Sequence, residues 1–432
     1  MSKSKQPMST STFMDTFVKG NPLVTAIEKR ALSEDDLSHK ITVRCDNNLG
    51  FAEWDCAGME VGLDTGFFMS PPHAYELYSR IRLLMMMGYV KRHPASYDYD
   101  KHIHLADLKK IPAPKKLKGT GNSIFIRGRS GGGKTTLMES VLDTIPTVIE
   151  HPPSPLTGGR EIRQVSWVKV DMSKGASRKA FYRNVIQEID KVLGTSFAAK
   201  IPSRYVEDER FLYMIKVCRM ACLGVLVIDD VQWALSGTAA NANQKVTNEF
   251  LEQLFNLLGI PLVFIGTPEA EKLKGFAEQT GRRLAHNGMI EINSDSVTST
   301  FWRDMVKTMF VSFLGMDSDH INNDFYHIIH YYTEGNASRL KTIVGNLLRR
   351  EVTGNITAEH IHEAYSQEKG AFEELKTPFI QLSQSKGKKL SGKATSSKPQ
   401  KNTANKTTVE DSCEDEDDFE DAFIITGGTH GQ

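Results

Sequence analysis

Short, uniformly apolar runs alternate with longer amphipathic stretches through the middle of the chain. Apolar runs of strand length occupy 124–126, 165–170, 224–228 and 262–265. Apolar residues at helical spacing follow Thr135 and cover about 177–193, 211–222 and 247–258. Strands without polar alternation are typical of parallel sheets covered on both faces, and the intervening helices provide the crossover connections. The pattern therefore predicts an α/β core with a parallel sheet between helices.

Helical periodicity alone continues beyond this core. The stretches after Ile292 are 301–314, 325–333, 337–352 and 358–366, which predict an all-α lid. Before the core, one clear helical pattern covers 74–87, and a connector rich in proline and lysine follows at 111–121. We expect a partner-binding N-terminal appendage at 1–112, the α/β core at 113–296, the helical lid at 297–372 and a disordered tail at 373–432.

Composition and charge narrow the classes of protein. The chain has 432 residues, 40% of them hydrophobic, which is enough for two or three domains. The net charge is zero, but eight lysines lie within 376–406 without an acid, and nine acids lie within 410–421 without a base. Such blocks are typical of solvated, disordered segments. The five cysteines form no paired framework, and no signal peptide or membrane span is evident, so we expect a cytoplasmic protein.

Glycine-rich residues 128–136 lie between an apolar strand and a predicted helix. They match the pattern G-x-x-x-x-G-K-[ST] of a P-loop, in which glycines let backbone N–H groups point at phosphate oxygens. Lys134 would reach the outer phosphates of ATP, Thr135 would bind Mg²⁺, and the following helix would direct its positive dipole end at the anion. The predicted nucleotide-binding residues are Gly128, Ser130, Gly131, Gly132, Gly133, Lys134, Thr135 and Thr136.

A pair of acids ends the apolar run at 225–228. Asp229, at the carboxyl end of a strand, would hold Mg²⁺, and Asp230 would polarise the attacking water. A buried strand that runs into an acidic turn is common by itself, but the upstream P-loop favours a Walker B arrangement. Because Asp230 is one methylene shorter than the glutamate usual at this position, we predict slow ATP turnover.

Three further features extend this pattern towards the C-terminus. Thr267 follows the strand at 262–265, and its hydroxyl would orient the attacking water or sense the γ-phosphate. Arg282 and Arg283 form a basic pair, although a surface arginine pair is more often merely solvated. Arg339 lies in the pattern G-x-x-x-R at the start of a lid helix, where it would contact the nucleotide.

The order of these motifs along the chain, from the P-loop to the lid arginine, resembles the order in the AAA+ ATPases. Within them the chain is similar to the transposition regulators of the TnsC, TniB and MuB group, and most of all to TnsC. The segments that carry the finer resemblance are 225–232, with the pattern V-I-D-[ED]-[VI]-Q, 265–270 and 281–283, with weaker matches at 21–23 and 88–94. The resemblance covers roughly residues 15 to 370.

The resemblance implies a regulator that uses ATP and Mg²⁺. With ATP bound, such a protein assembles as a ring or helical filament on double-stranded DNA. It links a target-selection protein to the transposase subunits, and ATP hydrolysis resets the assembly. Arg282 or Arg283 of one subunit would complete the site of its neighbour, so nucleotide occupancy and assembly would be coupled. The expected setting is a prokaryotic cytoplasm, in association with the nucleoid.

DNA contacts are expected from the loop and helix after the second strand. The basic residues there are Lys169, Lys174, Arg178, Lys179 and Arg183. Lysine and arginine on the inner face of a ring neutralise phosphates without reading bases, which predicts binding without strong sequence preference. For any single residue, a solvated basic helix face is nearly as good an interpretation. Repetition of the subunit along a filament favours the DNA contact, because weak contacts are multiplied.

Two other functions stay open at this point. The first is another AAA+ ATPase that processes DNA, such as a replication initiator or loader, which would gain support from a winged-helix or helix-turn-helix domain. None is evident after Ser366. The second is a P-loop kinase for a small molecule, which would need a second substrate pocket. The arginine pair and the lid arginine instead suit completion of the site between subunits.

Overall fold

The computed structural model of the chain describes residues 20–43, 55–90, 92–95, 122–172, 177–232, 250, 254–268, 283 and 285–367. These residues all belong to one compact unit. The predictions for Lys174, for Arg282 and for the tail at 373–432 lie outside the described residues.

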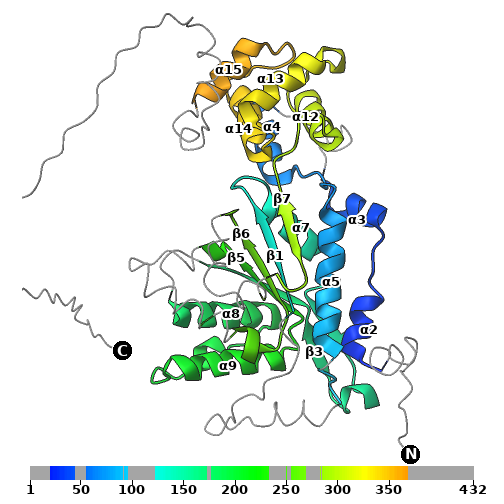
Figure 1. Cartoon of the computed structure of the whole chain (residues 1–432), viewed down its shortest axis with the longest axis vertical. Coiled ribbons are helices and arrows are strands. Elements are labelled where there is room, and N and C mark those ends of the chain that lie inside the picture. The colour runs from blue at the N-terminus through cyan, green and yellow to red at the C-terminus, as the bar shows by residue number, and fades with distance from the viewer. Residues whose placement is uncertain are drawn as a thin grey trace, which may run out of the picture. The chain divides into compact units, whose positions relative to one another are not determined.

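A parallel sheet forms the centre of the fold (Figure 1). Its described strands have the order β4-β5-β6-β1-β7. Their bounds are β1 Ser123–Gly128, β4 Trp167–Asp171, β5 Val225–Asp229, β6 Leu262–Gly266 and β7 Met289–Ile292. All the neighbouring strands pair in parallel, and Asp171 is in register with Asp229, as Gly128 is with Ile292. The carboxyl ends of the strands therefore meet at one edge of the sheet. The predicted fold, a P-loop AAA+ core followed by a helical part, is confirmed.

Alternate residues of each central strand face opposite layers of helices, as the two-residue period of a strand requires. Phe125, Leu226 and Phe264 contribute to the core shared with α8 (Arg178–Leu193) and α9 (Glu207–Met220). The residues between them in the strands point to the other face. Ile126, Val227 and Ile265 contribute to the core shared with α5 (Ala74–Val90) and α7 (Lys134–Asp143). Figure 1 shows α8 and α9 on one side of the sheet and α5 on the other.

Helix α5, predicted as part of an N-terminal appendage, is integrated with the sheet. The buried Tyr89 hydroxyl donates a hydrogen bond to the Cys222 carbonyl oxygen at 2.8 Å. Gly88 lies so close to the segment before β6 that a Cβ there would be 2.6 Å from the Pro261 ring. Helices α2 (Pro22–Glu28) and α3 (Glu34–Ile41) pack against the outer face of α5. The predicted boundary at residue 112 itself stays a prediction.

The helical lid follows β7. Its described helices are α12 (Thr300–Ser312), α13 (Asn323–Thr333), α14 (Ala337–Arg349) and α15 (Ala358–Gln367), with the 3₁₀ turn η9 (Ser318–His320). Helix α4 (Cys56–Gly66), from the N-terminal region, packs against α14 and shares the lid core. The Phe67 ring, which follows α4, meets the Phe313 ring edge-on at 5.5 Å between centroids. The N-terminal region thus contacts both the sheet, through α5, and the lid, through α4.

Some elements differ from the predicted ones. The apolar stretch at 165–170 is divided between β3 (Ile162–Val165) and β4, and β3 pairs with β2 (Val148–His151) in an antiparallel hairpin that contains the turn η4 (Pro155–Thr157). Strand β7 has only four residues and lies at the edge of the sheet, so its apolar signal was too short to predict a strand. The remaining short elements are η5 (Ala198–Lys200) and η7 (Leu254–Leu258). None of the described helices is both long and apolar enough to cross a membrane.

Candidate active site

The P-loop connects β1 to α7 and has the backbone geometry that its glycines predict. Gly131 and Gly133 have φ of 74° and 79°, in the left-handed region that residues with a Cβ rarely adopt. A Cβ on Gly128 would lie 2.3 Å from the Ile292 carbonyl oxygen. Gly133 caps α7 without a side-chain hydrogen bond, so the first N–H groups of that helix are not used by a capping side chain. This arrangement fits a phosphate cradle at a helix N-terminus.

The lysine and threonine of the P-loop face the acids at the end of β5. The Lys134 ammonium donates a hydrogen bond to the Arg129 carbonyl oxygen at 2.8 Å. Burial lowers its pKa, whereas the charges of Asp229 and Asp230 act to raise it. The Thr135 hydroxyl donates to Asp229 Oδ2 at 2.8 Å, although these residues are far apart in the sequence. The structure therefore brings the predicted nucleotide-binding and Walker B residues together.

Asp229 and Thr135 offer oxygen ligands of the kind that Mg²⁺ prefers. The Asp229 side chain is only 4% exposed. Its Oδ1 accepts a hydrogen bond from the Asp230 backbone N–H at 2.8 Å, so the carboxylate is held in place. Burial raises the pKa of Asp229, and the hydrogen bond from Thr135 opposes that change. The pairing of a hydroxyl with a fixed carboxylate at the end of a strand fits the predicted magnesium site.

Asp230 and Thr267 are connected through Gln232. Asp230 is exposed and has φ of 54°, a left-handed conformation that is uncommon for a residue with a side chain. Gln232 Nε2 donates to Asp230 Oδ1 at 2.9 Å, and Gln232 Oε1 accepts from the Thr267 backbone N–H at 3.3 Å. The Thr267 hydroxyl is buried and has no hydrogen-bond partner among the described residues. The carboxylate and the hydroxyl predicted to handle water thus lie on neighbouring strand ends.

Lys169 lies at this same edge of the sheet. Its ammonium contacts Glu139 Oε1 and Asp171 Oδ1, both at 2.9 Å, and Asp229 Oδ2 at 3.6 Å. Burial acts to lower the pKa of Lys169, but hydrogen bonds from the ammonium to Glu139 and Asp171 raise it above its usual range. Because three carboxylates surround this charge, the geometry favours a role beside Asp229 over the predicted contact with DNA.

The other described residues of the predicted DNA surface lie on α8. Arg178 forms an ion pair with Glu207 at 3.1 Å and its guanidinium lies 5.9 Å from the Phe250 ring centroid. Lys179 and Arg183 line a surface hollow of about 410 Å³. The other residues that line it are Ala180, Asn184, Gln187 and Arg210. Arg210, on α9, is a basic residue of this surface that no sequence pattern singled out.

The lid touches the P-loop directly. Asn336 caps α14 by accepting from the backbone N–H groups of Ser338 and Arg339, and its own amide donates to the Ser130 carbonyl oxygen at 3.1 Å. The Ser338 N–H also donates to the Gly131 carbonyl oxygen at 3.3 Å. Arg339 forms an ion pair with Glu334 at 3.1 Å, and the same carboxylate oxygen lies 3.7 Å from the Arg129 guanidinium. The predicted lid arginine therefore lies beside the P-loop.

Arg283 lies at the other end of β1. Its carbonyl oxygen accepts a hydrogen bond from the hydroxyl of Ser123, the first residue of that strand. The P-loop begins at the last residue, Gly128, about 16 Å away at the rise of a β-strand. An arginine side chain does not span that distance, so Arg283 does not reach the P-loop of its own chain.

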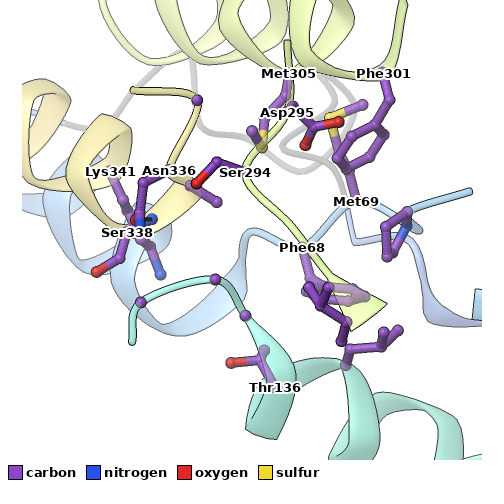
Figure 2. Close-up of a pocket in the computed structure, with 18 of the residues that line it drawn as sticks. Phe68, Met69, Thr136, Ser294, Asp295, Phe301, Met305, Asn336, Ser338 and Lys341 are labelled. Carbon is purple, nitrogen blue, oxygen red and sulfur yellow. Dashed lines mark hydrogen bonds between the residues drawn. The ribbon is translucent and has the colours of Figure 1, made fainter. Parts of the chain in front are cut away.

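A pocket of about 400 Å³ opens beside the P-loop glycines (Figure 2). Figure 2 shows Phe68 and Met69 facing it from the segment after α4, and Phe301 and Met305 from α12. Its polar side chains include Ser294, Asp295, Asn336 and Ser338. Apolar walls with a few polar groups are typical of sites for small organic ligands. The sequence patterns did not identify the residues of this pocket outside the P-loop, because they come from three distant segments.

His73 and Asp295 are two titratable residues that line this pocket. Burial lowers the pKa of His73, whereas the charges of Asp295 and Glu76 act to raise it. Burial raises the pKa of Asp295, and a hydrogen bond from the Ser299 hydroxyl, at 3.1 Å, opposes that change. The His73 Nε2 atom is buried and has no hydrogen-bond partner among the described residues.

Comparison with known proteins agrees with this geometry. Residues 117–273 match the model of an AAA domain. The fold, the P-loop and this match define the class: these residues have the fold of a P-loop AAA+ domain. None of the curated proteins compared with the chain matches it.

Solved structures resemble the chain only distantly. A Walker-type ATPase of Pyrococcus abyssi has 12% identity and a TM-score of 0.41, over 68% of this chain and 77% of that one. The ORC2 protein of Aeropyrum pernix, solved as ADPNP-ADP complexes, has 11% identity and a TM-score of 0.38, over 64% and 73%. The ORC1 protein of Aeropyrum pernix, solved with DNA, has 13% identity and a TM-score of 0.36, over 63% and 65%.

Proposed function

We propose that the protein is an ATP-dependent, DNA-binding regulator of transposition of the TnsC kind. It oligomerises on duplex DNA, links a target-selection protein to the transposase, and is reset by slow ATP hydrolysis. The observation that carries the proposal is the distance between the nucleotide site and the arginine of the predicted pair. Lys134, Thr135 and Asp229 form one site at the carboxyl edge of the sheet, whereas Arg283 lies at the opposite end of β1.

Nucleotide binding uses the P-loop and the adjoining pocket. The phosphates of ATP lie against the N–H groups at the start of α7 and against Lys134, and the base and ribose enter the pocket lined by Phe68, Met69 and Met305. Bound Mg²⁺ would be held by Thr135 and Asp229 and would neutralise charge on the phosphate oxygens. Asp230 accepts the proton of the attacking water, and the Thr267 hydroxyl orients that water.

A neighbouring subunit completes the site. Arg283 does not reach its own P-loop, and an arginine supplied across an interface stabilises the charge that develops during phosphoryl transfer. Arg282, next to it in the sequence, is the second candidate for this role. An arrangement in which each subunit presents an arginine to the next is heterologous, so it closes into a ring or continues as a helical filament. ATP therefore stabilises the assembly, and hydrolysis weakens it.

DNA binding is assigned to the surface of α8. Lys179 and Arg183 line its hollow together with Arg210, and their cations suit the phosphate backbone of duplex DNA. Arg178 is ion-paired with Glu207, so it contributes less charge to this surface. Lys174 is kept as a contact from the sequence alone. One or two phosphate contacts on each subunit are enough for a repeated assembly, since contacts along a filament act together.

The transposition partners are proposed from the sequence resemblance. Its support is the segment at 225–232 and those at 265–270 and 281–283. A replication initiator or loader would share the ATP site, so the partner assignment needs its own test. Immobilised full-length protein with ATP and duplex DNA is expected to retain the transposase subunits of the same element. Retention of replicative helicase in their place would support the alternative.

Electron microscopy tests the central proposal. The full chain is mixed with duplex DNA and either a non-hydrolysable ATP analogue or ADP. We expect rings or filaments on DNA with the analogue only, and none with the Lys134→Ala variant. A protein that stays monomeric with every nucleotide and with DNA would contradict the proposal. ATP-dependent phosphorylation of a metabolite, with no response to DNA, would support the small-molecule kinase instead.

A further inference from the structure

The side chain of Gln232 connects the ends of two neighbouring strands. Its amide nitrogen donates to Asp230 Oδ1 at 2.9 Å, just beyond β5. Its amide oxygen accepts from the backbone N–H of Thr267 at 3.3 Å, just beyond β6. An amide offers both a donor and an acceptor in one planar group, so a single side chain can bind a carboxylate and a backbone N–H. Neither the sequence pattern nor the proposed function gives Gln232 a role.

Asp230 needs a partner that fixes its direction. Its backbone is left-handed at φ 54°, a conformation that is uncommon for a residue with a side chain. Its side chain is exposed, and within the described part of the chain Gln232 gives the only hydrogen bond to its carboxylate. With Oδ1 held by Gln232, Oδ2 is left to accept a proton. An unsupported aspartate would rotate freely in water.

Thr267 is fixed through the same amide. Its hydroxyl is buried without a partner among the described residues, and its backbone N–H is bound to Gln232. One side chain therefore contacts both the Asp230 carboxylate and the residue that carries this hydroxyl. A reaction between water and a phosphate is sensitive to such placement, because a displacement of about 1 Å costs roughly 100-fold in rate.

We propose that Gln232 is a positioning residue of the hydrolytic site, and this inference rests on the proposed ATP hydrolysis. It orients the carboxylate of Asp230 and ties it to the end of β6, so that Asp230 and Thr267 act on the same water. In the reaction, the water oxygen bonds to the γ-phosphorus and the bond from that phosphorus to the β–γ bridging oxygen breaks. ADP leaves, and the water proton passes to Asp230.

Two substitutions separate the two hydrogen bonds. Gln232→Ala removes both of them. Gln232→Glu keeps an acceptor for the Thr267 N–H but cannot donate to Asp230, and it adds a like charge beside that carboxylate. We expect Gln232→Ala to lower kcat about 10-fold or more and Gln232→Glu to lower it at least as much. Gln367→Ala, on the exposed end of α15, is the matched control and keeps the parental kcat.

Binding and folding are measured on the same proteins. The Kd of a fluorescent ATP analogue with Mg²⁺, and the Tm without nucleotide, are expected to stay close to parental values in both Gln232 variants. A loss of kcat without a loss of affinity or stability marks a positioning role. Parental kcat in Gln232→Ala or in Gln232→Glu would overturn the inference. A kcat that falls only in step with the Tm would do the same.

A double-mutant cycle with Asp230→Ala completes the test. If Gln232 acts through Asp230, adding Gln232→Ala to the Asp230→Ala chain costs no further turnover, measured as single-turnover phosphate release. Multiplied losses would overturn the inference while leaving the proposed function intact. Absence of phosphate release from the parent chain, with and without duplex DNA, would instead overturn the proposed hydrolysis and this inference with it.

Discussion

At the scale of single residues, the chemistry depends on the carboxylate of Asp230. We expect Asp230→Asn to lower kcat about 100-fold or more, because an amide cannot accept the proton of the attacking water. Nucleotide binding remains, since Lys134 and Thr135 are unchanged. The variant is therefore expected to stay in an ATP-bound assembly on DNA. The fraction of protein that sediments with duplex DNA in the presence of ATP measures this. An Asp230→Asn chain that hydrolyses ATP at the parental rate would show that another group is the general base.

The effect of pH on stability can also be predicted for single residues. Burial lowers the pKa of His73 below its ordinary value of 6.5, so the unfolded chain binds a proton at higher pH than the folded chain does. Titration of His73 therefore lowers the free energy of unfolding as the pH falls from about 6.5 towards the pKa of His73 in the folded chain. Above that range, its titration does not change the free energy of unfolding.

Urea unfolding between about pH 7.5 and 5 measures this effect. His73→Gln is expected to lose less stability on acidification than the parent. Asp295 has the opposite effect on stability as the pH falls. Burial raises its pKa, so its protonation at lower pH favours the folded state. Equal acid-induced losses in His73→Gln and the parent would contradict the assignment.

At the scale of elements, α14 couples the lid to the P-loop. Asn336 both caps α14 and donates to the Ser130 carbonyl oxygen, whereas Asn322 caps α13 by accepting from the Phe325 N–H and makes no P-loop contact. Loss of either cap is expected to cost about 1 kcal/mol of stability. Only Asn336→Ala is expected to weaken ATP binding, by several fold. Isothermal titration calorimetry measures the Kd for ATP in both variants. Equal affinities in Asn336→Ala and Asn322→Ala would show that the contact does not matter for binding.

Elements differ in how well their sequence predicts them. The strands that became β1, β5 and β6 are continuous apolar runs, and the lid helices have clear periodicity, so both follow from local pattern. The edge strand β7 and the hairpin of β2 and β3 have four residues each, which is too short for a distinct period. The place of α5 against the sheet was not predictable either, because its apolar face suits any hydrophobic layer.

At the scale of the whole molecule, completion of the site between subunits predicts rescue on mixing. A chain with Arg282→Ala and Arg283→Ala keeps its P-loop, and a Lys134→Ala chain keeps its arginines. In an equal mixture, at most one interface in about four combines an intact P-loop with intact arginines, so rescue up to about a quarter of the parental ATPase rate is expected. Phosphate release as a function of mixing ratio measures it. No rescue at any ratio would argue against completion in trans.

The sequence by itself determined the phosphate site of this protein. Residues 128–136 and the acids at 229–230 are runs of consecutive residues, and their chemistry depends on local backbone geometry that glycine and strand ends impose. The tertiary structure decided what surrounds that site. It placed Gln232 beside Thr267, Lys169 among three carboxylates, and Arg283 at the far end of β1. These contacts join distant segments through the register of parallel strands and the packing of helices, and no local pattern in the chain encodes such a register.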